Sequence, residues 1–442
     1  MNDTRPSIRV MPARSALAAV VSLLLGVAPL ASAQYGTPAP ASGGAQPQQA
    51  QQPAQQPPGE TVRPEIGKAV NDARELINTQ KYAEALAAVR EAEKLPDRTP
   101  FENYVLDQVR GVAAARSGDS ATAIKSFEAV IATGRQNAQD QLKIVEVLAQ
   151  LNFQAKDYKK AAEWALRYQK EGGTDPQSRL LRVRALYLAE DYATAAAEIR
   201  TQLDAEEKAG AAPPSLQQLQ LLASSYTKVK DDAGYNYALE KLLVYHPTKE
   251  YWNDAIYRVE KRQGFPDRLR LDVLRLREAT GSLLSAGQYS AMMQLALNAA
   301  LPGEAKRIAD RGFSSGLLGT GDDAEMEKKL RDTANRQAAE DEKLLAQGAV
   351  SGANAKDGTG LFNVGFAYVN AGQAAKGLAL MEQGMQKGGV PRPDEARLHL
   401  GIAYFTAGQK AKAIATFKEV GGTEGTAELA HLWMIQAQKL PG

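Results

Sequence analysis

The sequence predicts an all-α fold made of stacked helix–turn–helix repeats, and three observations support this prediction. The stretch 361–420 contains two aligned blocks, in which Gly365 matches Gly401 and Tyr368 matches Tyr404, each 36 positions later. Self-similarity at a period of about 34 residues is typical of stacked helix pairs. Apolar residues in both blocks recur every three or four positions, as on one face of a helix. The abundant Ala, Leu, Glu, Lys, Gln and Arg favour helix over strand.

A glycine marks the turn between the two amphipathic helices of each block. Gly372 and Gly408 both follow Ala and precede Gln, and glycine readily takes the left-handed conformation that ends a helix. In the last block Phe417 follows the small Ala413 by four positions and is expected to fill the space beside it. Small residues in the first helices would let the paired helices approach closely.

This pattern resembles the tetratricopeptide repeat, a family of all-α solenoids. The resemblance is strongest at five positions of the last block: Gly401, Tyr404, Gly408, Ala413 and Phe417. It is looser in the preceding block, where Gly377 replaces the expected Ala and Met381 the expected aromatic residue. The resemblance implies a right-handed α-solenoid of helix–turn–helix repeats that covers most of residues 63–440.

Residues 1–33 are predicted to be a cleaved secretory signal peptide. Its marks are a positive n-region, a short apolar run and a small-residue cleavage site: Arg5, Arg9, Arg14, then 16–28, then Ala31-Ser32-Ala33. The alternative is an uncleaved anchor, but Pro29 interrupts the apolar run before a bilayer could be crossed. The mature chain would then begin near Gln34 as a periplasmic bacterial protein, with no stable membrane insertion after cleavage.

Residues 34–62 form a Gln-, Pro- and Ala-rich segment with almost no apolar side chain larger than Ala. Such a composition cannot bury a core, so we expect a disordered linker. The alternative is a proline-rich recognition segment, although no basic residue accompanies these prolines.

The remaining chain divides into three predicted regions. Residues 63–210 read as four tetratricopeptide-like repeats, in which Tyr82, Tyr158 and Tyr192 each precede the packed Ala by three positions. Residues 215–347 form an irregular helical region after an insertion at 206–214, and end in a charged helix with a solvated face. Residues 358–440 contain the C-terminal repeats. Their last helix, about 427–438, is placed to cap the open end of the array.

The sequence contains no constellation typical of catalysis, metal binding or a cofactor. Cysteine is absent, and the three histidines, His246, His399 and His431, do not have the spacing of a zinc-binding helix. His399 lies within a predicted repeat helix and is interpreted as structural. The glycines of the 316–321 loop lack the lysine of a phosphate-binding loop. We therefore predict a non-enzymatic protein without catalytic residues, metal ligands or cofactors.

Charge argues against nucleic acid as a partner. Removal of residues 1–33 takes away three arginines and one aspartate, which leaves 50 basic and 50 acidic side chains of the 53 and 51 in the full chain. Nucleic-acid binding requires clustered positive charge, and no such cluster is present in the sequence. We expect protein or peptide partners.

One feature of the C-terminal repeats points to binding. The helix that begins at Leu361 is apolar nearly all round, and such a helix has to be covered on every side. Six residues would form an apolar strip on the groove side: Phe362, Phe366, Val369, Leu398, Ile402 and Phe405. Two interpretations stay open, a partner-binding groove and ordinary core packing.

The function predicted from these observations is a periplasmic scaffold or adaptor that mediates protein–protein interactions in the cell envelope. A narrower alternative is an accessory component of an envelope assembly or TonB-type transport system, because residues 245–252 faintly resemble repeat proteins of such clusters. A helical cell-wall enzyme and a self-associating structural protein are the competing classes. The first would require an acid in a non-repeat domain, which the sequence does not show.

Overall fold

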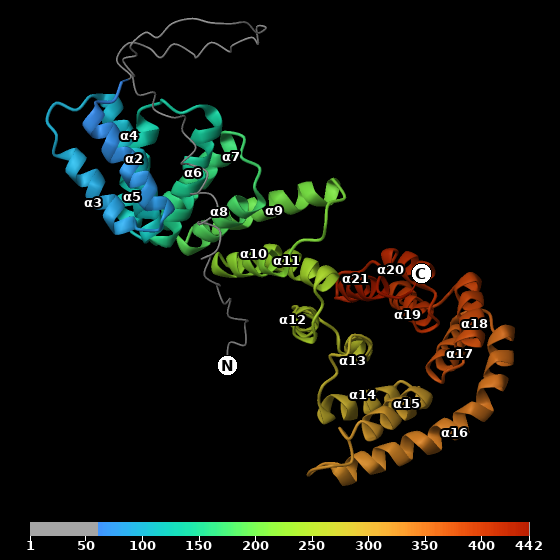
Figure 1. The fold of residues 1–442 in the computed structure, drawn as a ribbon. Helices are drawn as coiled ribbons and strands as arrows, with labels where there is room; N and C mark the ends of the chain where they lie inside the picture. Colours follow the sequence, from blue (N-terminus) through green and yellow to red (C-terminus); the bar gives the residue numbers. More distant parts are fainter. Residues whose placement is uncertain (1–60, 442) are drawn as a thin grey trace, which may run out of the picture. The chain divides into compact units, whose positions relative to one another are not determined.

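The computed structural model describes residues 61–441, and every regular element in this range is a helix. The all-α prediction is therefore confirmed. The chain divides into two compact units, which meet at Asp232 and Ala233 (Figure 1). The predicted signal peptide and nearly all of the predicted linker lie outside the described residues. None of the helices described is long and apolar enough to cross a bilayer.

The N-terminal unit, residues 61–232, consists of consecutive helix pairs. Its helices are α2 (Pro64–Asn78), α3 (Tyr82–Glu93), α4 (Pro100–Ser117), α5 (Ser120–Ala132), α6 (Ala138–Gln154), α7 (Tyr158–Lys170), α8 (Pro176–Leu188), α9 (Tyr192–Lys208) and α10 (Leu216–Lys228). α2 contacts α4, α6 contacts α8, and α8 contacts α10, whereas the second helices of the pairs pack mainly against the first helices on either side. First helices therefore contact one another along the stack and form its inner layer.

Three turns within the pairs of the N-terminal unit share one local structure. The residue before the cap is left-handed, as at Gly118, Lys156 and Glu190 with φ of 86°, 63° and 63°. An aspartate follows, and its carboxylate accepts a hydrogen bond from a backbone N–H of the second helix. In the C-terminal repeats Gly372 and Gly408 take φ of 86° and 71°, which confirms the turn predicted there.

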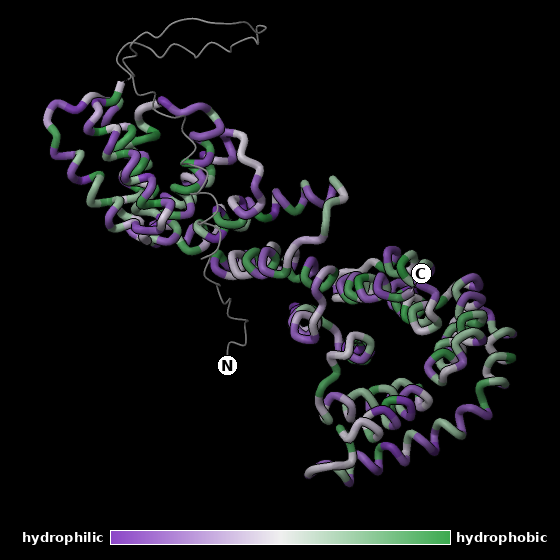
Figure 2. Tube along the Cα trace, in the orientation of Figure 1, coloured by the Kyte–Doolittle hydropathy of each residue, from purple (hydrophilic) through white to green (hydrophobic). Residues whose placement is uncertain are grey.

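The C-terminal unit, residues 233–441, contains almost all of α11 and the helices after it. They are α11 (Asp232–Tyr245), α12 (Lys249–Glu260), the short 3-10 helix η1 (Asp267–Leu269), α13 (Arg270–Ala279), α14 (Ala286–Asn298), α15 (Pro302–Ser314), α16 (Ala324–Asn354), α17 (Thr359–Asn370), α18 (Ala374–Lys387), α19 (Pro393–Thr406), α20 (Lys410–Lys418) and α21 (Thr426–Ala437). Hydrophilic residues recur along α16 (Figure 2), and few of its residues are buried. This agrees with the predicted solvated face.

The C-terminal unit closes on itself. Helices α12 to α21 follow one another round a ring, and α21 contacts α12 and α13 (Figure 1). The amide of Gln436 in α21 donates a 2.9 Å hydrogen bond to the carbonyl oxygen of Ala279 at the end of α13. The prediction that the last helix caps an open end is therefore wrong, because α12 and α13 cover that helix.

One hydrophobic core joins the two ends of this ring. It contains Leu239 and Trp252 from the start of the unit and Phe417 and Trp433 from its end. The structure thus places the predicted regions 215–347 and 358–440 largely in one compact unit, with the division at Asp232. The contacts that close the ring, such as that of Gln436 with Ala279, link residues more than a hundred positions apart, and repeat periodicity carries no information about such contacts.

Candidate functional site

The apolar strip predicted in the C-terminal repeats lies in the core of the C-terminal unit. Leu398 is 0% exposed, Val369 2%, Phe362 3%, and Phe366 and Ile402 5% each. Phe405 is half-buried and packs against the same core. Of the two interpretations left open, core packing is the one that describes these side chains, and the strip forms no open groove.

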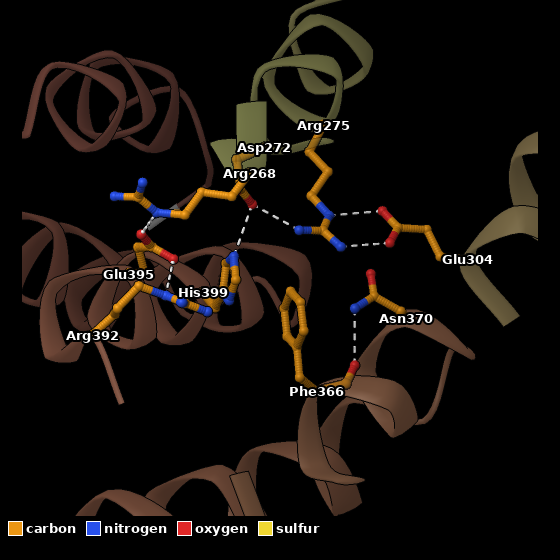
Figure 3. Close-up of polar contacts among 9 residues, drawn as sticks. All are labelled: Arg268, Asp272, Arg275, Glu304, Phe366, Asn370, Arg392, Glu395 and His399. Atoms are coloured by element: carbon orange, nitrogen blue, oxygen red, sulfur yellow. Dashed lines mark hydrogen bonds and ion pairs between the residues drawn. The ribbon is translucent and has the colours of Figure 1, made fainter. Parts of the chain in front are cut away.

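Polar side chains of the same unit lie against Phe366, one residue of the strip (Figure 3). The guanidinium carbon of Arg275 in α13 lies 4.9 Å from the ring centroid of Phe366. His399 in α19 stacks on the same ring, with centroids 4.6 Å apart and planes 11° apart. Asn370 donates a 2.9 Å hydrogen bond to the carbonyl oxygen of Phe366 in its own helix. The inner positions of α17 and α19 are thus occupied by groups of the same chain.

Four side chains form a buried ionic cluster, namely Asp272, Arg275, Glu304 and His399. Arg275 donates two hydrogen bonds to Glu304, of 2.8 and 2.6 Å, and a third of 2.7 Å to Asp272. His399 Nε2 lies 2.9 Å from the same oxygen of Asp272. Arg275, Asp272 and Glu304 are buried. The cluster joins α13 to α15 and α19, and so stabilises the closed arrangement of these helices.

The electrostatics of this cluster favour fixed charges. Burial acts to raise the pKa of Asp272, but His399 and Arg275 outweigh it and lower that pKa to about 2. Burial likewise acts to lower the pKa of Arg275, but the carboxylates of Glu304 and Asp272 outweigh it and raise that pKa. General acid–base catalysis works best with a pKa near the operating pH. Asp272 and Arg275 therefore hold charge and do not exchange protons near neutrality.

Further ion pairs surround the cluster at the surface (Figure 3). Arg268 pairs with Glu395 and Glu424, and Arg392 Nε lies 2.8 Å from Glu395. The sequence did not single out Arg268, Asp272, Arg275 or Glu304, because the region around α13 shows no repeat pattern. Its charges are interleaved as on any solvated helix, so no local signal distinguishes the buried ones.

The N-terminal unit offers a more accessible surface, between the inner helices α6 and α8. A hollow of about 80 Å³, here called the α6–α8 hollow, is lined by Gln150, Phe153, Gln154, Gln177, Ser178, Leu180, Leu181 and Arg184. Most of these side chains are half-buried or exposed. The hollow therefore presents an aromatic ring, aliphatic groups and amides to the surroundings.

Arg184 and Gln150 give this hollow its polarity. The guanidinium carbon of Arg184 lies 5.4 Å from the ring centroid of Phe153, and burial lowers the pKa of Arg184. The Oε1 atom of Gln150 is buried and accepts no hydrogen bond from any described residue. A cation with reduced hydration and an unsatisfied acceptor are both stabilised when a peptide supplies a carboxylate or an N–H group.

A second hollow lies on the other side of α8. It measures about 290 Å³ and is here called the α8–α10 hollow, with lining residues from α8, α9, α10 and the connection 211–215. Leu180, Val183, Ile199 and Leu221 supply apolar walls, and Pro213 and Pro214 form part of the cover. The insertion noted in the sequence therefore shapes a cavity.

The sequence contained a usable signal for the α6–α8 hollow. Phe366 and Ile402 were selected because each directly follows a small packing residue. In the N-terminal repeats Gln150 follows the buried Ala149, and Arg184 follows the buried Val183. Gln150 and Arg184 thus occupy the same repeat position as Phe366 and Ile402. A search restricted to apolar side chains does not select them.

Comparison with known families matches the tetratricopeptide repeat model to residues 109–177 and 365–422. One matched segment lies in each compact unit, and tetratricopeptide repeats are typical of scaffolds that bind other proteins. No curated protein matches the sequence.

Three solved structures are similar to the chain. A tetratricopeptide repeat protein from Parabacteroides merdae shows 12% identity over 84% of this chain and 99% of that one, with a TM-score of 0.29. Yeast Tom70 shows 14% identity over 84% and 95%, with a TM-score of 0.24. A chain from the structure of Naa15/Naa10 bound to HypK shows 16% identity over 82% of this chain and 58% of that one, with a TM-score of 0.30.

Proposed function

We propose that the protein is a non-enzymatic scaffold of the bacterial periplasm and that it binds a partner protein at the inner surface across α6 and α8. The observation that carries this proposal is the α6–α8 hollow, where Phe153 and Arg184 lie beside a buried acceptor of Gln150 that lacks a hydrogen-bond partner. Binding energy at protein interfaces concentrates in a few aromatic and arginine anchors of this kind. The strip in the C-terminal unit is covered by the chain itself and offers no comparable surface.

The periplasmic part of the proposal rests on the sequence of residues 1–33, with its arginines, apolar run and small-residue site. A role in envelope assembly or in a TonB-type transport system is the narrower form of the same proposal. Cell fractionation with N-terminal sequencing tests the location. A mature chain that begins near Gln34 in the periplasmic fraction supports it, and a chain that begins at Met1 in the membrane pellet contradicts it.

Site-specific photo-crosslinking tests the docking surface. A photoreactive phenylalanine analogue replaces Gln154, which is exposed and lines the α6–α8 hollow, or Ala83, which is exposed on α3. We expect one discrete adduct from position 154 in living cells and none from position 83. Phe153→Ser and Arg184→Ala should each reduce that adduct at least about tenfold, with unchanged helical content.

Two results would contradict this assignment of the docking surface. The first is the same set of adducts from both positions, which would mean nonspecific contact. The second is an adduct from position 154 that neither Phe153→Ser nor Arg184→Ala weakens. Both side chains are half-buried and lie at the surface, so a large fall in the melting temperature of either variant is not expected.

A further inference from the structure

The two hollows beside α8 are neighbours. Gln177 and Leu180 line both of them, so the hollows meet at the N-terminal half of α8. A peptide chain that crosses α8 at Gln177 and Leu180 could place one side chain in each of the two hollows. The shared rim is polar at Gln177, which is exposed. This amide could donate to or accept from the backbone of such a chain.

The hollows carry opposite charges. Arg184 is the only charged residue that lines the α6–α8 hollow, and Glu206 is the only one that lines the α8–α10 hollow. Glu206 is half-buried and accepts a 2.7 Å hydrogen bond from Gln202. A carboxylate at the rim of an apolar cavity favours a side chain with an apolar stem and a positive end.

A carboxylate near the first hollow fixes where an acidic group could bind. The hydroxyl of Ser178 donates to Glu146 over 3.4 Å, and burial together with Asp175 raises the pKa of Glu146. An acidic side chain would be repelled at that end of the α6–α8 hollow. It is attracted at the opposite end, where Arg184 lies over Phe153.

The apolar walls accommodate the stems of both side chains. Phe153 and Leu181 border the first hollow, whereas Val183, Ile199 and Leu221 border the second. The second hollow, of about 290 Å³, has roughly ten times the volume of about 30 Å³ that one water molecule occupies in the liquid. It can therefore hold a long side chain such as that of lysine or arginine.

The width of a helix sets the spacing of the two side chains. An α-helix with its side chains is about 10 Å across, and an extended chain rises by about 3.3 Å per residue. A segment that crosses α8 and fills both hollows therefore needs anchors about three or four positions apart. An extended backbone leaves its N–H groups available, and one of them could reach the buried Oε1 atom of Gln150.

We infer that the two hollows form one docking surface for an extended peptide segment of a partner, which carries an acidic residue at Arg184 and a basic residue at Glu206, about three or four positions apart. This inference rests on the proposed function and specifies the partner's chemistry. The opposite charges decide which side chain of the segment enters which hollow. A segment with two acidic or two basic residues at these positions binds poorly.

An array of synthetic peptides tests the inference with the purified mature chain. The probes are twelve-residue peptides that carry one Glu and one Lys, two Glu or two Lys, at separations of two to six positions. We expect the wild-type chain to favour the peptides with one Glu and one Lys over the like-charged peptides by about tenfold, which corresponds to about one charge-assisted contact, with the optimum at three or four positions.

Single charge reversals provide the decisive variants. Arg184→Glu should shift the preference to peptides with two Lys, and Glu206→Lys should shift it to peptides with two Glu. Matched reversals of the exposed pair at the start of α3, Lys81→Glu and Glu84→Lys, should leave the preference unchanged. Neutral variants, Arg184→Gln and Glu206→Gln, weaken the preference without placing a wrong charge, and so cover the case in which a reversal variant fails to fold.

The outcomes separate this inference from the proposed function. Peptide binding without a preference for opposite charges, a preference that survives both reversals, or no binding to any peptide would each overturn the inference. The photo-crosslink at position 154 and its dependence on Phe153 would then still decide the proposed function. The expected shift of preference in both reversal variants supports the inference.

Discussion

In the N-terminal unit the principal contacts of each helix are with helices one or two places away along the chain, whereas in the C-terminal unit α21 also contacts α12 and α13. Asp272 and His399, which meet in the buried ionic cluster, are 127 positions apart. A stack with neighbour contacts alone loses structure locally when one repeat is damaged. A closed unit couples its ends, so damage at one point weakens contacts throughout.

The difference between the open and the closed unit also explains where binding is expected. Closure brings α13 over the inner face of α17 and α19, and Arg275 and His399 cover the apolar strip there. Within residues 61–232 the structure shows no such cover over α6 and α8, and the two hollows are accessible there. The same repeat pattern thus serves stability in one unit and offers a docking surface in the other.

The largest effect is expected from Phe366→Ser combined with Ile402→Ser. Both side chains are 5% exposed in the core of the closed unit, so the double change should lower the free energy of unfolding by about 5 kcal/mol or more. Hydrogen exchange should increase from α12 to α21 and stay unchanged in residues 61–232. As a control, Leu344→Ser with Val350→Ser on the exposed face of α16 should change little. Near-wild-type stability of the core variant would restore the groove interpretation.

A matched pair of phenylalanines compares the two units directly. Phe127 and Phe417 each pack against a glycine of the preceding helix, Gly111 and Gly401, where a Cβ atom would collide with the ring. Phe127→Ala and Phe417→Ala should each cost about 3 to 5 kcal/mol. We expect faster hydrogen exchange mainly in α4–α6 for the first, and also in α12 and α13 for the second. Equally local effects would show that closure does not couple the ends.

Arg275→Met should cost about 3 kcal/mol at neutral pH, because it leaves Asp272 and Glu304 buried without their cation. The loss should become smaller in mild acid, where the uncompensated carboxylates can take up protons. Arg110→Met is the control in the open unit, since Arg110 also pairs with two carboxylates, Glu93 and Asp107, but is only half-buried. Chemical denaturation of both variants should show the smaller loss for Arg110.

The smallest effect concerns His431, which joins α21 to Glu240 in α11 over 3.1 Å. The hydrogen bond to Glu240 raises the pKa of His431. The pair therefore stabilises the fold fully below the unfolded pKa of about 6.5, and this contribution is lost as pH rises through the folded pKa. The His431 side chain is 45% exposed, so the change is below about 1 kcal/mol.

Melting curves at pH 6 and pH 8 measure this difference. The C-terminal unit of the wild type should lose slightly more stability between the two values than that of His431→Asn. The three histidines, His246, His399 and His431, all lie in the C-terminal unit, so the N-terminal unit serves as an internal reference. A wild-type unit that gains stability relative to His431→Asn as pH rises would contradict the assignment.

Local sequence patterns determined the helices and the turns. Apolar spacing predicted the helix pairs, and Gly372 and Gly408 were predicted as left-handed turn residues, as the structure shows. These features depend on interactions within a few residues, where the side-chain types decide the outcome. The Ala–Asp turns at Asp157 and Asp191 follow from the same local rule, because a short carboxylate reaches the first free N–H groups.

Only the tertiary structure decided that the C-terminal helices close onto α12 and α13, and hence that Phe366 lies in a core. Closure depends on small rotations added over many helix pairs, and no single pair contains that information. Its charged contacts, such as Asp272 with His399, bring together residues that look ordinary in their own helices. The docking surface likewise depends on tertiary packing. No sequence pattern distinguishes Arg184 or Glu206, and each gains a role because packing places it in a hollow beside α8.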